Sequence, residues 1–403
     1  MKQLFTKAIA VAIACAAVQT SHAQTAVEPI RVGFINPLTG GSQDFGNSAR
    51  LGAEMAVKEI NEVGGYLGRP IQLIERDDQS TPEVGRRVAE DLVLKEHVAF
   101  TLGFTNTGVA LKALDVFQTH KSLLVVPVST GSAVTAQYPA KDSYIFRLSA
   151  RDTLQASLIV DDIIHRGLNK IAIFADKTGY GDGGLSDLKT FLGQHGVTPI
   201  YVSRFDLGVK SLTQEVQEAK AAGAQAIIGY SVAPELTVLM RSRAEAKFGG
   251  LVYGSWPLSS HTVWERAGTA AEGAIMVQTI IQDISNERRS TFMARLRHFA
   301  GRQQVGSLMA AAQTYDAMYL MLHAMFQTRG NTKGDALKQA LEHMDRPYTG
   351  VVTDYVKPFS PQDHDAYTRN MIWLGVWRKG EVVFLYPEDA KRAGFIRRKE
   401  VAR

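Results

Sequence analysis

The sequence alternates short apolar runs with stretches of helical period, and this alternation restricts the chain to few folds. Apolar runs are predicted to form strands at 30–35, 71–74, 98–102 and 123–126, and the helices between and after them are predicted at 48–61, 84–95 and 109–119. Strands separated by helices of about 10 to 15 residues indicate βαβ units with parallel strands and right-handed crossovers. The first part of the chain therefore predicts an α/β lobe.

A second α/β unit of similar size begins after a strand predicted at 144–148. Its helices are predicted at 153–165, 185–194, 212–222 and 235–247, and its strands at 170–174, 199–205, 226–229 and 251–254. The chain then becomes mostly helical, with predicted helices at 287–301, 307–328 and 334–344, a loop-rich stretch, and two last strands at 371–378 and 382–385. The length of 403 residues leaves room for two or three compact units.

The first 23 residues have the pattern of a cleaved export signal. Two lysines precede an apolar run at 8–18, and residues 21–23 supply small side chains where a signal peptidase cuts. This run is about half as long as a membrane span requires. The only cysteine, Cys15, lies within the signal, so the exported chain is expected to lack thiols; lipid attachment at Cys15 is the less favoured alternative. We therefore expect a periplasmic location.

Charge and composition exclude several classes of protein. The formal charge of +5 is small for this length and gives no support to nucleic-acid binding, which requires basic residues clustered on one face. A hydrophobic fraction of 45% is ordinary for a globular chain. The basic tail at 391–403 is predicted to be a solvated chain end, with a role at a membrane surface as the alternative.

Two hydroxyl-rich loops are the first candidates for a binding site. Residues 103–108 (GFTNTG) and 127–132 (PVSTGS) follow neighbouring predicted strands, and each opens a helix. Ligands of parallel sheets bind beyond the carboxyl ends of the strands, where the next helix presents free N–H groups. Hydroxyls beside such groups suit a carboxylate or a phosphate. These side chains could equally be ordinary helix caps.

Recognisable catalytic motifs are missing from the sequence. It contains no GxxxxGK[ST] phosphate loop, no HExxH zinc helix and no GxSxG nucleophile elbow. Asp363-His364-Asp365 could be a metal or acid–base group, but its Pro- and Gln-containing loop favours a turn with a solvated histidine. Asp77 and Asp78 are predicted to cap the end of a strand. We therefore expect no enzyme, no cofactor and no metal.

Six short motifs in order along the chain suggest a family. They are 32–40 (VGFINPLTG), 52–61 (GAEMAVKEIN), 77–80 (DDQS), 176–181 (DKTGYG), 221–224 (AAGA) and 270–273 (AAEG). Together they resemble the periplasmic substrate-binding proteins of branched-chain amino-acid ABC transporters. The resemblance implies a type I periplasmic-binding-protein fold, with two doubly wound, Rossmann-like lobes that close about a hinge on a small molecule. It also implies docking on a membrane permease, and we expect a monomer.

The resemblance further implies that the lobes are interleaved in sequence. Residues 29–148 with 280–356 would form the N-terminal lobe, and residues 149–279 with 357–390 the C-terminal lobe.

Part of the family's ligand pocket carries over residue by residue. Thr107 matches the hydroxyl residue that holds the ligand carboxylate, and Val128 and Thr130 match positions of backbone and hydroxyl contact. Tyr180 matches a pocket tyrosine of the second lobe, and Phe45 matches an aromatic wall. The resemblance therefore implies an intact carboxylate subsite.

The ammonium subsite of amino-acid binders does not carry over. Its acidic anchor corresponds to Trp256, and the accompanying pocket tyrosine corresponds to Val232, with Tyr230 two residues earlier. A buried ammonium needs a carboxylate or a ring of acceptors, whereas tryptophan offers a flat face and one N–H donor. Filling the core is the alternative role for Trp256. We therefore favour an uptake receptor for a small organic carboxylate, aromatic acids included, over a receptor for leucine, isoleucine or valine.

Two alternatives stay open from the sequence. One is a transport receptor for an amino acid or an amide, with the ammonium held by other residues. The other is a ligand-sensing subunit of a signalling system that uses the same two lobes.

Overall fold

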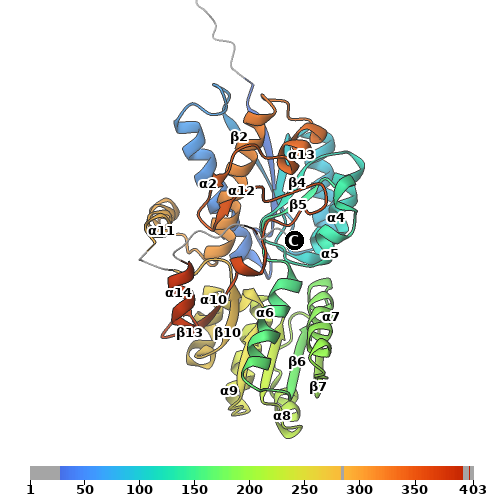
Figure 1. Cartoon of the computed structure of the whole chain (residues 1–403), viewed down its shortest axis with the longest axis vertical. Coiled ribbons are helices and arrows are strands. Elements are labelled where there is room, and N and C mark those ends of the chain that lie inside the picture. Colours follow the sequence, from blue (N-terminus) through green and yellow to red (C-terminus); the bar gives the residue numbers. More distant parts are fainter. Residues whose placement is uncertain (1–27, 283–285, 394–398, 400–403) are drawn as a thin grey trace, which may run out of the picture.

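The chain forms two lobes stacked along its long axis (Figure 1). The computed structural model describes residues 28–282, 286–393 and 399. One sheet of five strands and one of seven form the centres of the lobes, which confirms the predicted α/β class. Within the described ranges, no helix combines the length and the apolar character needed to cross a bilayer. The predicted export signal at 1–23 lies outside these ranges.

The N-terminal lobe contains five parallel strands in the order β2-β1-β3-β4-β5. These are β1 (Ile30–Asn36), β2 (Ile71–Asp77), β3 (Phe100–Gly103), β4 (Leu124–Val126) and β5 (Ile145–Arg147). From β1 the chain first adds β2 on one side and then crosses back to add β3, β4 and β5 on the other side. The strand order therefore reverses between β1 and β3. Open α/β sheets bind ligands at such a switch point, beyond the carboxyl ends of the strands.

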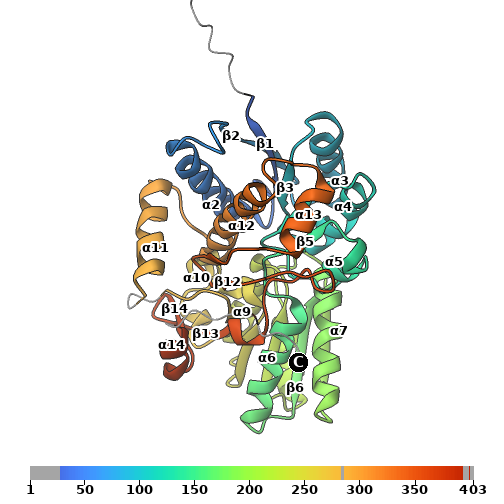
Figure 2. The ribbon, with the colours of Figure 1, turned by 45° about the horizontal axis from the view of Figure 1, so that its top comes forward.

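Helices cover both faces of this sheet (Figure 2). They are α2 (Gln43–Glu62), α3 (Pro82–Glu90), α4 (Thr107–Thr119) and α5 (Ala133–Ala136), joined from later in the chain by α12 (Leu308–Gln327). Helix α11 (Glu287–Ala300) packs on α2, and α13 (Gly334–Glu342) packs on α12. Helices α2 and α12 pack together on one face, and α3 and α4 on the other. A Cβ at Gly52 of α2 would lie 2.1 Å from the carbonyl oxygen of Ala311, so glycine permits this close helix pair.

The C-terminal sheet has the order β14-β13-β10-β9-β8-β6-β7. Its strands are β6 (Ile171–Asp176), β7 (Tyr201–Phe205), β8 (Ala226–Tyr230), β9 (Leu251–Gly254), β10 (Ile275–Gln278), β13 (Trp373–Arg378) and β14 (Glu381–Phe384). Strands β6 to β10 are parallel and repeat the topology of the N-terminal sheet, and β13 and β14 extend the β10 edge in antiparallel fashion. The two predicted α/β units are thus two copies of one arrangement.

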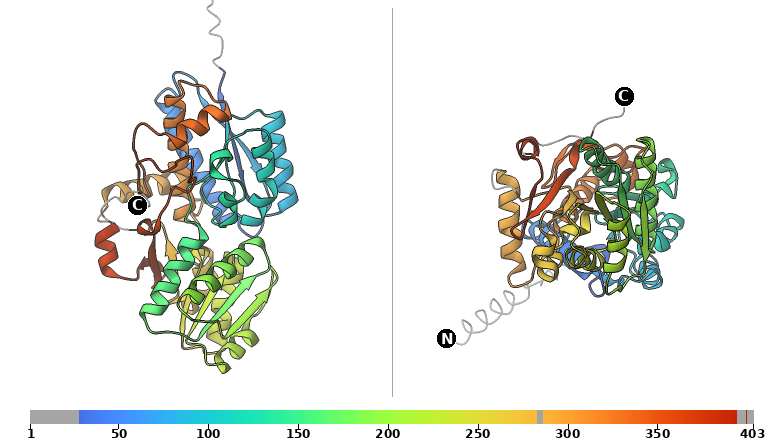
Figure 3. Two further views of the ribbon diagram at one scale, coloured as in Figure 1. Left: turned by 45° about the vertical axis from the view of Figure 1, so that its right-hand side comes forward. Right: turned by 90° about the horizontal axis from the view of Figure 1, so that it is seen from below.

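The helices of the C-terminal lobe lie on the two faces of its sheet (Figure 3). They are α6 (Asp152–His165), α7 (Gly179–Gln194), α8 (Thr213–Ala221), α9 (Ala233–Glu245), α10 (His261–Ala267) and α14 (Pro387–Ala393). Helix α6 packs beside α7, and α9 packs beside α8 and α10. The sequence predicted neither α10 nor β10. Since all four residues of β10 are buried and the run is short, it shows no alternation of apolar and polar side chains.

The segment 357–367 lies against the N-terminal lobe, so the predicted boundary after residue 356 is wrong. The backbone N–H of Arg147 in β5 donates to the carbonyl of His364 at 2.9 Å, and Ala366 donates to the carbonyl of Arg147 at the same distance. A small hairpin, β11 (Tyr348–Thr349) with β12 (Asp354–Tyr355), precedes this segment. The chain re-enters the C-terminal sheet only with β13.

His364 is buried, so the prediction of a solvated histidine in the 363–365 motif is also wrong. Its ring stacks on Phe146 with a centroid distance of 3.8 Å. Its Nδ1 lies 2.9 Å from the carbonyl oxygen of Ile145, and its Nε2 lies 3.1 Å from Glu342 Oε1. Burial lowers the pKa of His364. Across the described ranges, no group of three or more His, Cys, Asp or Glu side chains is arranged to hold a metal ion.

One lysine of the predicted basic tail packs against the 357–367 segment and forms polar contacts there. Lys399 Nζ lies 2.6 Å from Asp363 Oδ2 and donates to the carbonyl of Pro358 at 2.9 Å. The prediction of a solvated chain end therefore fails at Lys399. Residues 391–393 belong to α14, and the other tail residues lie outside the described ranges.

Candidate ligand-binding site

A cavity of about 160 Å³ lies between the lobes. Its walls come from the loops that follow β1, β2, β3 and β4 of one sheet and β6, β7, β8 and β9 of the other. The lining residues are Ser42, Phe45, Ser80, Pro82, Thr105, Asn106, Thr107, Gly108, Val109, Thr130, Thr178, Tyr180, Leu207, Val232, Trp256 and Pro257. The carboxyl ends of both parallel sheets thus converge on one cavity, which is the expected position for a ligand.

The N-terminal wall is built around the first turn of α4. Thr107 is the first residue of this 13-residue helix, and its Oγ1 lies 3.1 Å from Ser129 Oγ and accepts the N–H of Gly131 at 3.2 Å. A Cβ at Gly131 would lie 2.1 Å from Thr107 Cγ2, so only glycine lets the two loops approach this closely. Free N–H groups at a helix start, with hydroxyls beside them, favour a bound anion.

Aromatic rings form much of the remaining wall. Phe45, near the start of α2, and Trp256, directly after β9, make an edge-to-face pair with ring centroids 4.9 Å apart. These two rings belong to different lobes. Tyr180, at the start of α7, packs against Tyr230 at the end of β8 with a centroid distance of 5.1 Å. The cavity therefore offers flat apolar surfaces beside its hydroxyl groups.

The lining carries no Asp, Glu, Lys, Arg or His side chain among the described residues. An anion can bind here through neutral N–H and O–H donors and the positive end of α4. An ammonium group would lack a carboxylate on the cavity wall to offset its loss of hydration.

A cluster of buried polar groups lies behind this wall. It contains Thr130, Asp152, Tyr180 and Tyr230, of which Thr130 and Tyr180 also line the cavity. Thr130 Oγ1, Asp152 Oδ2 and both tyrosine hydroxyls have no hydrogen-bond partner within the described part of the chain. Burial raises the pKa of Asp152 to about 7, against the opposing effects of the Thr130 and Tyr230 hydroxyls and of Arg147. This polar cluster connects the two lobes.

Five of the seven predicted site residues line the cavity. These are Phe45, Thr107, Thr130, Tyr180 and Trp256. The side chains of Val128 and Tyr230 are fully buried and do not line it. Contact between any of these residues and a ligand stays a prediction.

Sequence reasoning missed Asp152 altogether. An acidic residue in the first turn of a helix is a common capping feature, so nothing in the local sequence marks Asp152 as part of a site. It also missed Leu207 and Pro82, two apolar lining residues from the loops after β7 and β2.

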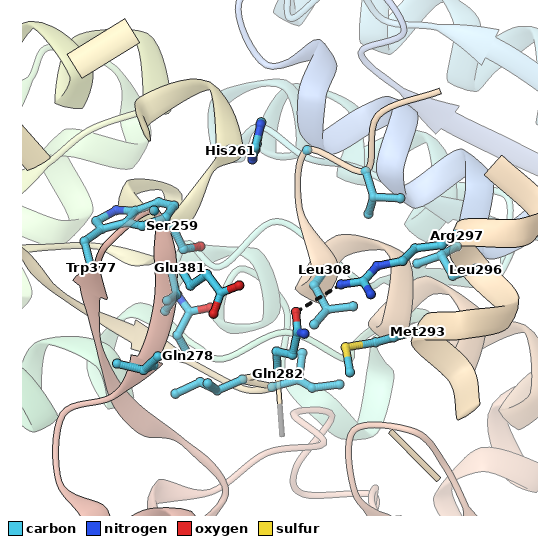
Figure 4. Close-up of a pocket in the computed structure, with 17 residues that line it drawn as sticks. Ser259, His261, Gln278, Gln282, Met293, Leu296, Arg297, Leu308, Trp377 and Glu381 are labelled. Carbon is cyan, nitrogen blue, oxygen red and sulfur yellow. Dashed lines mark hydrogen bonds between the residues drawn. The ribbon is translucent and has the colours of Figure 1, made fainter. Parts of the chain in front are cut away.

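A second cavity, of about 270 Å³, lies at the hinge (Figure 4). It lies between the β13–β14 edge, α11 and the segments near 280 and 306 that run between the lobes. Arg297 donates to Gln282 Oε1 across it at 3.1 Å. It contains none of the predicted site residues. Although it is the larger cavity, only the interlobe cavity gathers the ends of eight parallel strands, and we take that one as the candidate site.

A sequence model of the periplasmic binding protein family matches residues 29–381. The chain belongs to this family. Among curated relatives in the family, the Leu/Ile/Val-binding protein homolog 3 of Brucella melitensis is 32% identical over 254 residues, which are 63% of this chain and 68% of that protein. The leucine-, isoleucine-, valine-, threonine- and alanine-binding protein of Pseudomonas aeruginosa is 27% identical over 265 residues, or 65% and 70% of the two chains.

Solved structures of periplasmic binding proteins share the fold. A branched-chain amino-acid transporter substrate-binding protein from Streptococcus pneumoniae, in complex with isoleucine, has a TM-score of 0.76 at 19% identity and covers 88% of this chain and 98% of its own. A solute-binding protein from Rhodopseudomonas palustris HaA2, in complex with p-hydroxybenzoic acid, has a TM-score of 0.77 at 18% identity, with coverages of 89% and 95%. One fold thus accommodates both ligand classes, and the choice depends on the site.

Proposed function

We propose that this protein is an exported receptor that captures a small organic carboxylate, with aromatic acids as the leading class, and delivers it to the permease of an ABC importer. One observation carries the proposal. The interlobe cavity combines neutral donors at the start of α4 with aromatic walls, and no acidic side chain lines it. A carboxylate attached to a ring satisfies both halves of this arrangement.

The size of the cavity supports a ligand with a single ring. A cavity of about 150 Å³ in another protein binds benzene, and the cavity here measures about 160 Å³. The Phe45 and Trp256 rings come from different lobes and pack against each other, so a ligand ring that packs against this pair would contact both lobes at once. A ligand that contacts both lobes in the closed form shifts the hinge equilibrium towards closure. A permease can distinguish the closed, ligand-bound form from the open form by this change of shape.

Amino-acid binding is the second candidate, and it is favoured by the relatives. Curated proteins named for leucine, isoleucine and valine binding are similar to most of this chain. Against it, the family resemblance implies that the acidic anchor of amino-acid binders is replaced here by Trp256, which is neutral and 7% exposed.

A thermal-shift panel followed by calorimetry separates the two candidates. We expect benzoate and 4-hydroxybenzoate to raise the melting temperature, because each presents a carboxylate and a ring, and L-leucine to leave it unchanged. Benzamide is the matched control, since it keeps the ring and removes the charge. Stabilisation by L-leucine alone would reject the aromatic-acid proposal in favour of the amino-acid receptor.

Delivery to an importer is tested separately in cells. Uptake of radiolabelled 4-hydroxybenzoate should fall when the gene is deleted and return when it is restored. Unchanged uptake at limiting substrate would speak against transport of this acid.

A further inference from the structure

Asp152 occupies the junction of the two lobes. It begins α6 directly after the first crossing between them, and its backbone N–H donates to the carbonyl of Thr130 in the N-terminal lobe at 2.9 Å. Its Oδ1 accepts a hydrogen bond from Gln155 Nε2 at 3.2 Å, and Gln155 Oε1 accepts the N–H of Trp256 at 3.1 Å. Asp152 is therefore connected to both the hydroxyl wall and the aromatic wall of the cavity.

The other carboxyl oxygen of Asp152 has no hydrogen-bond partner among the described residues. Asp152 is 0% exposed, and its Oδ2 lies in the polar cluster with the hydroxyls of Thr130, Tyr180 and Tyr230, which are likewise unpartnered. The Thr130 and Tyr230 hydroxyls are near enough to influence the ionisation of Asp152, yet neither completes a hydrogen bond of normal geometry with Oδ2. A buried, unpaired carboxylate is costly, whereas a neutral carboxyl is a donor that needs one acceptor.

We infer that Asp152 is a specificity-determining residue that carries a proton when a carboxylate ligand is bound, so that ligand capture is coupled to the uptake of one proton. The inference rests on the proposed function, because the ligand carboxylate is placed at Thr107 and Thr130. Thr130 lines the cavity, and its hydroxyl also acts on the Asp152 carboxyl. A ligand carboxylate held at Thr130 would lie close to the fully buried Asp152 carboxyl, and two carboxylates at so short a distance raise the pKa of each other, so that one of them takes up a proton.

The charged groups around Asp152 do not remove this conflict. Arg147 is fully buried, but its Nε pairs with Asp365 at 2.6 Å and its Nη1 donates to the carbonyls of Thr130 and Gly131. Its charge is therefore already matched by Asp365.

The remaining titratable neighbours supply no free positive charge to Asp152. Asp187 on α7 adds repulsion, although Ser132 Oγ donates to it at 2.8 Å. Arg151, which precedes α6, pairs with Asp365 Oδ2 at 3.1 Å. Burial raises the pKa of both Tyr180 and Tyr230 far above 10, so both stay neutral.

The sign of the pH dependence follows from the pKa of Asp152, about 7 without ligand. Below this pH the residue already carries its proton, and the affinity for a carboxylate is constant. Above it, binding must draw a proton from solution, and the affinity falls by up to tenfold per pH unit. For an ammonium ligand the sign reverses, since binding then favours ionised Asp152. The affinity would rise by up to tenfold per unit towards pH 7 and level off above it.

Calorimetry with benzoate between pH 6 and 8.5 tests the inference. The carboxylate of benzoate stays ionised throughout this range, so any titration belongs to the protein. We expect the dissociation constant to be flat near pH 6 and to rise about tenfold between pH 7 and 8.5. At pH 8, enthalpies measured in two buffers of different ionisation enthalpy should report close to one proton taken up per ligand.

Three variants assign the proton. Asp152→Asn should abolish both the pH dependence and the proton uptake, whereas Asp187→Asn, the matched control at a carboxyl that acts on Asp152, should keep them. Tyr230→Phe removes a hydroxyl that lowers the pKa of Asp152, so the fall in affinity should begin at higher pH. If Asp152→Asn does not fold, the Tyr230→Phe shift decides the question alone.

Two results would overturn the inference while leaving the proposed function intact. They are benzoate binding with a pH-independent constant, and a slope that survives in Asp152→Asn. If neither benzoate nor 4-hydroxybenzoate binds at any pH, the proposed function itself fails. An affinity for L-leucine that rises towards pH 7 would replace it with the amino-acid receptor and give Asp152 the opposite role.

Discussion

Replacing Thr107 by valine is the most direct test of the carboxylate wall. The change keeps the shape of the side chain and removes one hydroxyl. That hydroxyl lies 3.1 Å from Ser129 Oγ and accepts the N–H of Gly131 at 3.2 Å. In the proposed complex it also donates to the ligand carboxylate. The variant therefore leaves a charged ligand oxygen short of one donor and a buried N–H short of one acceptor.

The size of the effect can be estimated from these two losses. Leaving a charged acceptor without one donor costs about 1–3 kcal/mol, which weakens the dissociation constant for benzoate about 5- to 150-fold. The unpaired N–H of Gly131 lowers the free energy of unfolding by about 1–3 kcal/mol as well, because Thr107 is 3% exposed. The first loss appears in binding and the second in stability.

Calorimetry and thermal unfolding of the same samples separate the two effects. The dissociation constant for benzoate should be measured well below the melting temperature, so that the variant is folded. Thr314→Val is the matched control, since Thr314 is fully buried in α12, donates to the carbonyl of Ala310 at 2.7 Å and does not line the cavity. It should lose stability without losing affinity. A Thr107→Val protein that binds benzoate as tightly as the wild type refutes the placement of the carboxylate at Thr107.

Two further predictions concern the aromatic wall and the lobe junction. Trp256→Glu places a negative charge on the aromatic wall, and at roughly 8 Å from a ligand carboxylate the repulsion costs about 2 kcal/mol. Calorimetry should therefore show that benzoate binds about 30-fold more weakly. An unchanged dissociation constant would place the ligand elsewhere. Asp365→Asn leaves the buried Arg147 guanidinium without its carboxylate and should lower the free energy of unfolding in urea by about 3 kcal/mol, whereas Asp206→Asn, which removes an exposed pair with Lys177, should change it by less than about 1 kcal/mol.

The sequence predicted most of the helices and strands because each produces a periodic pattern of apolar residues over a short stretch of chain. Strands such as β1 and β6 are apolar runs flanked by helices of regular spacing, and each was placed within two residues of its observed bounds. Helix α2 begins at Gln43, five residues before its predicted start. Its first turn contains Phe45, which is buried and lies on the same face as Ala49 and Ala56, but polar residues and a glycine surround it in sequence and hide the start of the apolar period.

Part of the site was also readable from the sequence. The loops after β3 and β4 combine hydroxyls with glycines, and the position of Thr107 at the start of α4 follows from the strand–helix boundary. The family resemblance added Tyr180 and Trp256. These residues have a local signal, either in a turn or in a motif.

The tertiary structure decided the contacts and the ionisation of residues that lie far apart in the sequence. His364 looked like a solvated turn residue, and only the stacking on Phe146 and the contact with Glu342 make it part of the core. Asp152 looked like an ordinary helix start, and only its burial against Thr130 and Tyr230 gives it a shifted pKa.

The sequence by itself determined two α/β lobes, because the spacing of apolar residues along each helix and strand indicates which of its faces is buried. It could not determine the cavity, because the walls are loops from eight strands whose distances depend on how two sheets meet. The pKa of a carboxyl likewise depends on burial and on charges far away in the sequence: burial raises the pKa of Asp365, but the Arg147 guanidinium holds it below its usual value. The carboxyl ends of the two parallel sheets form the candidate site, and the packing of the lobes sets the size and the lining of its cavity.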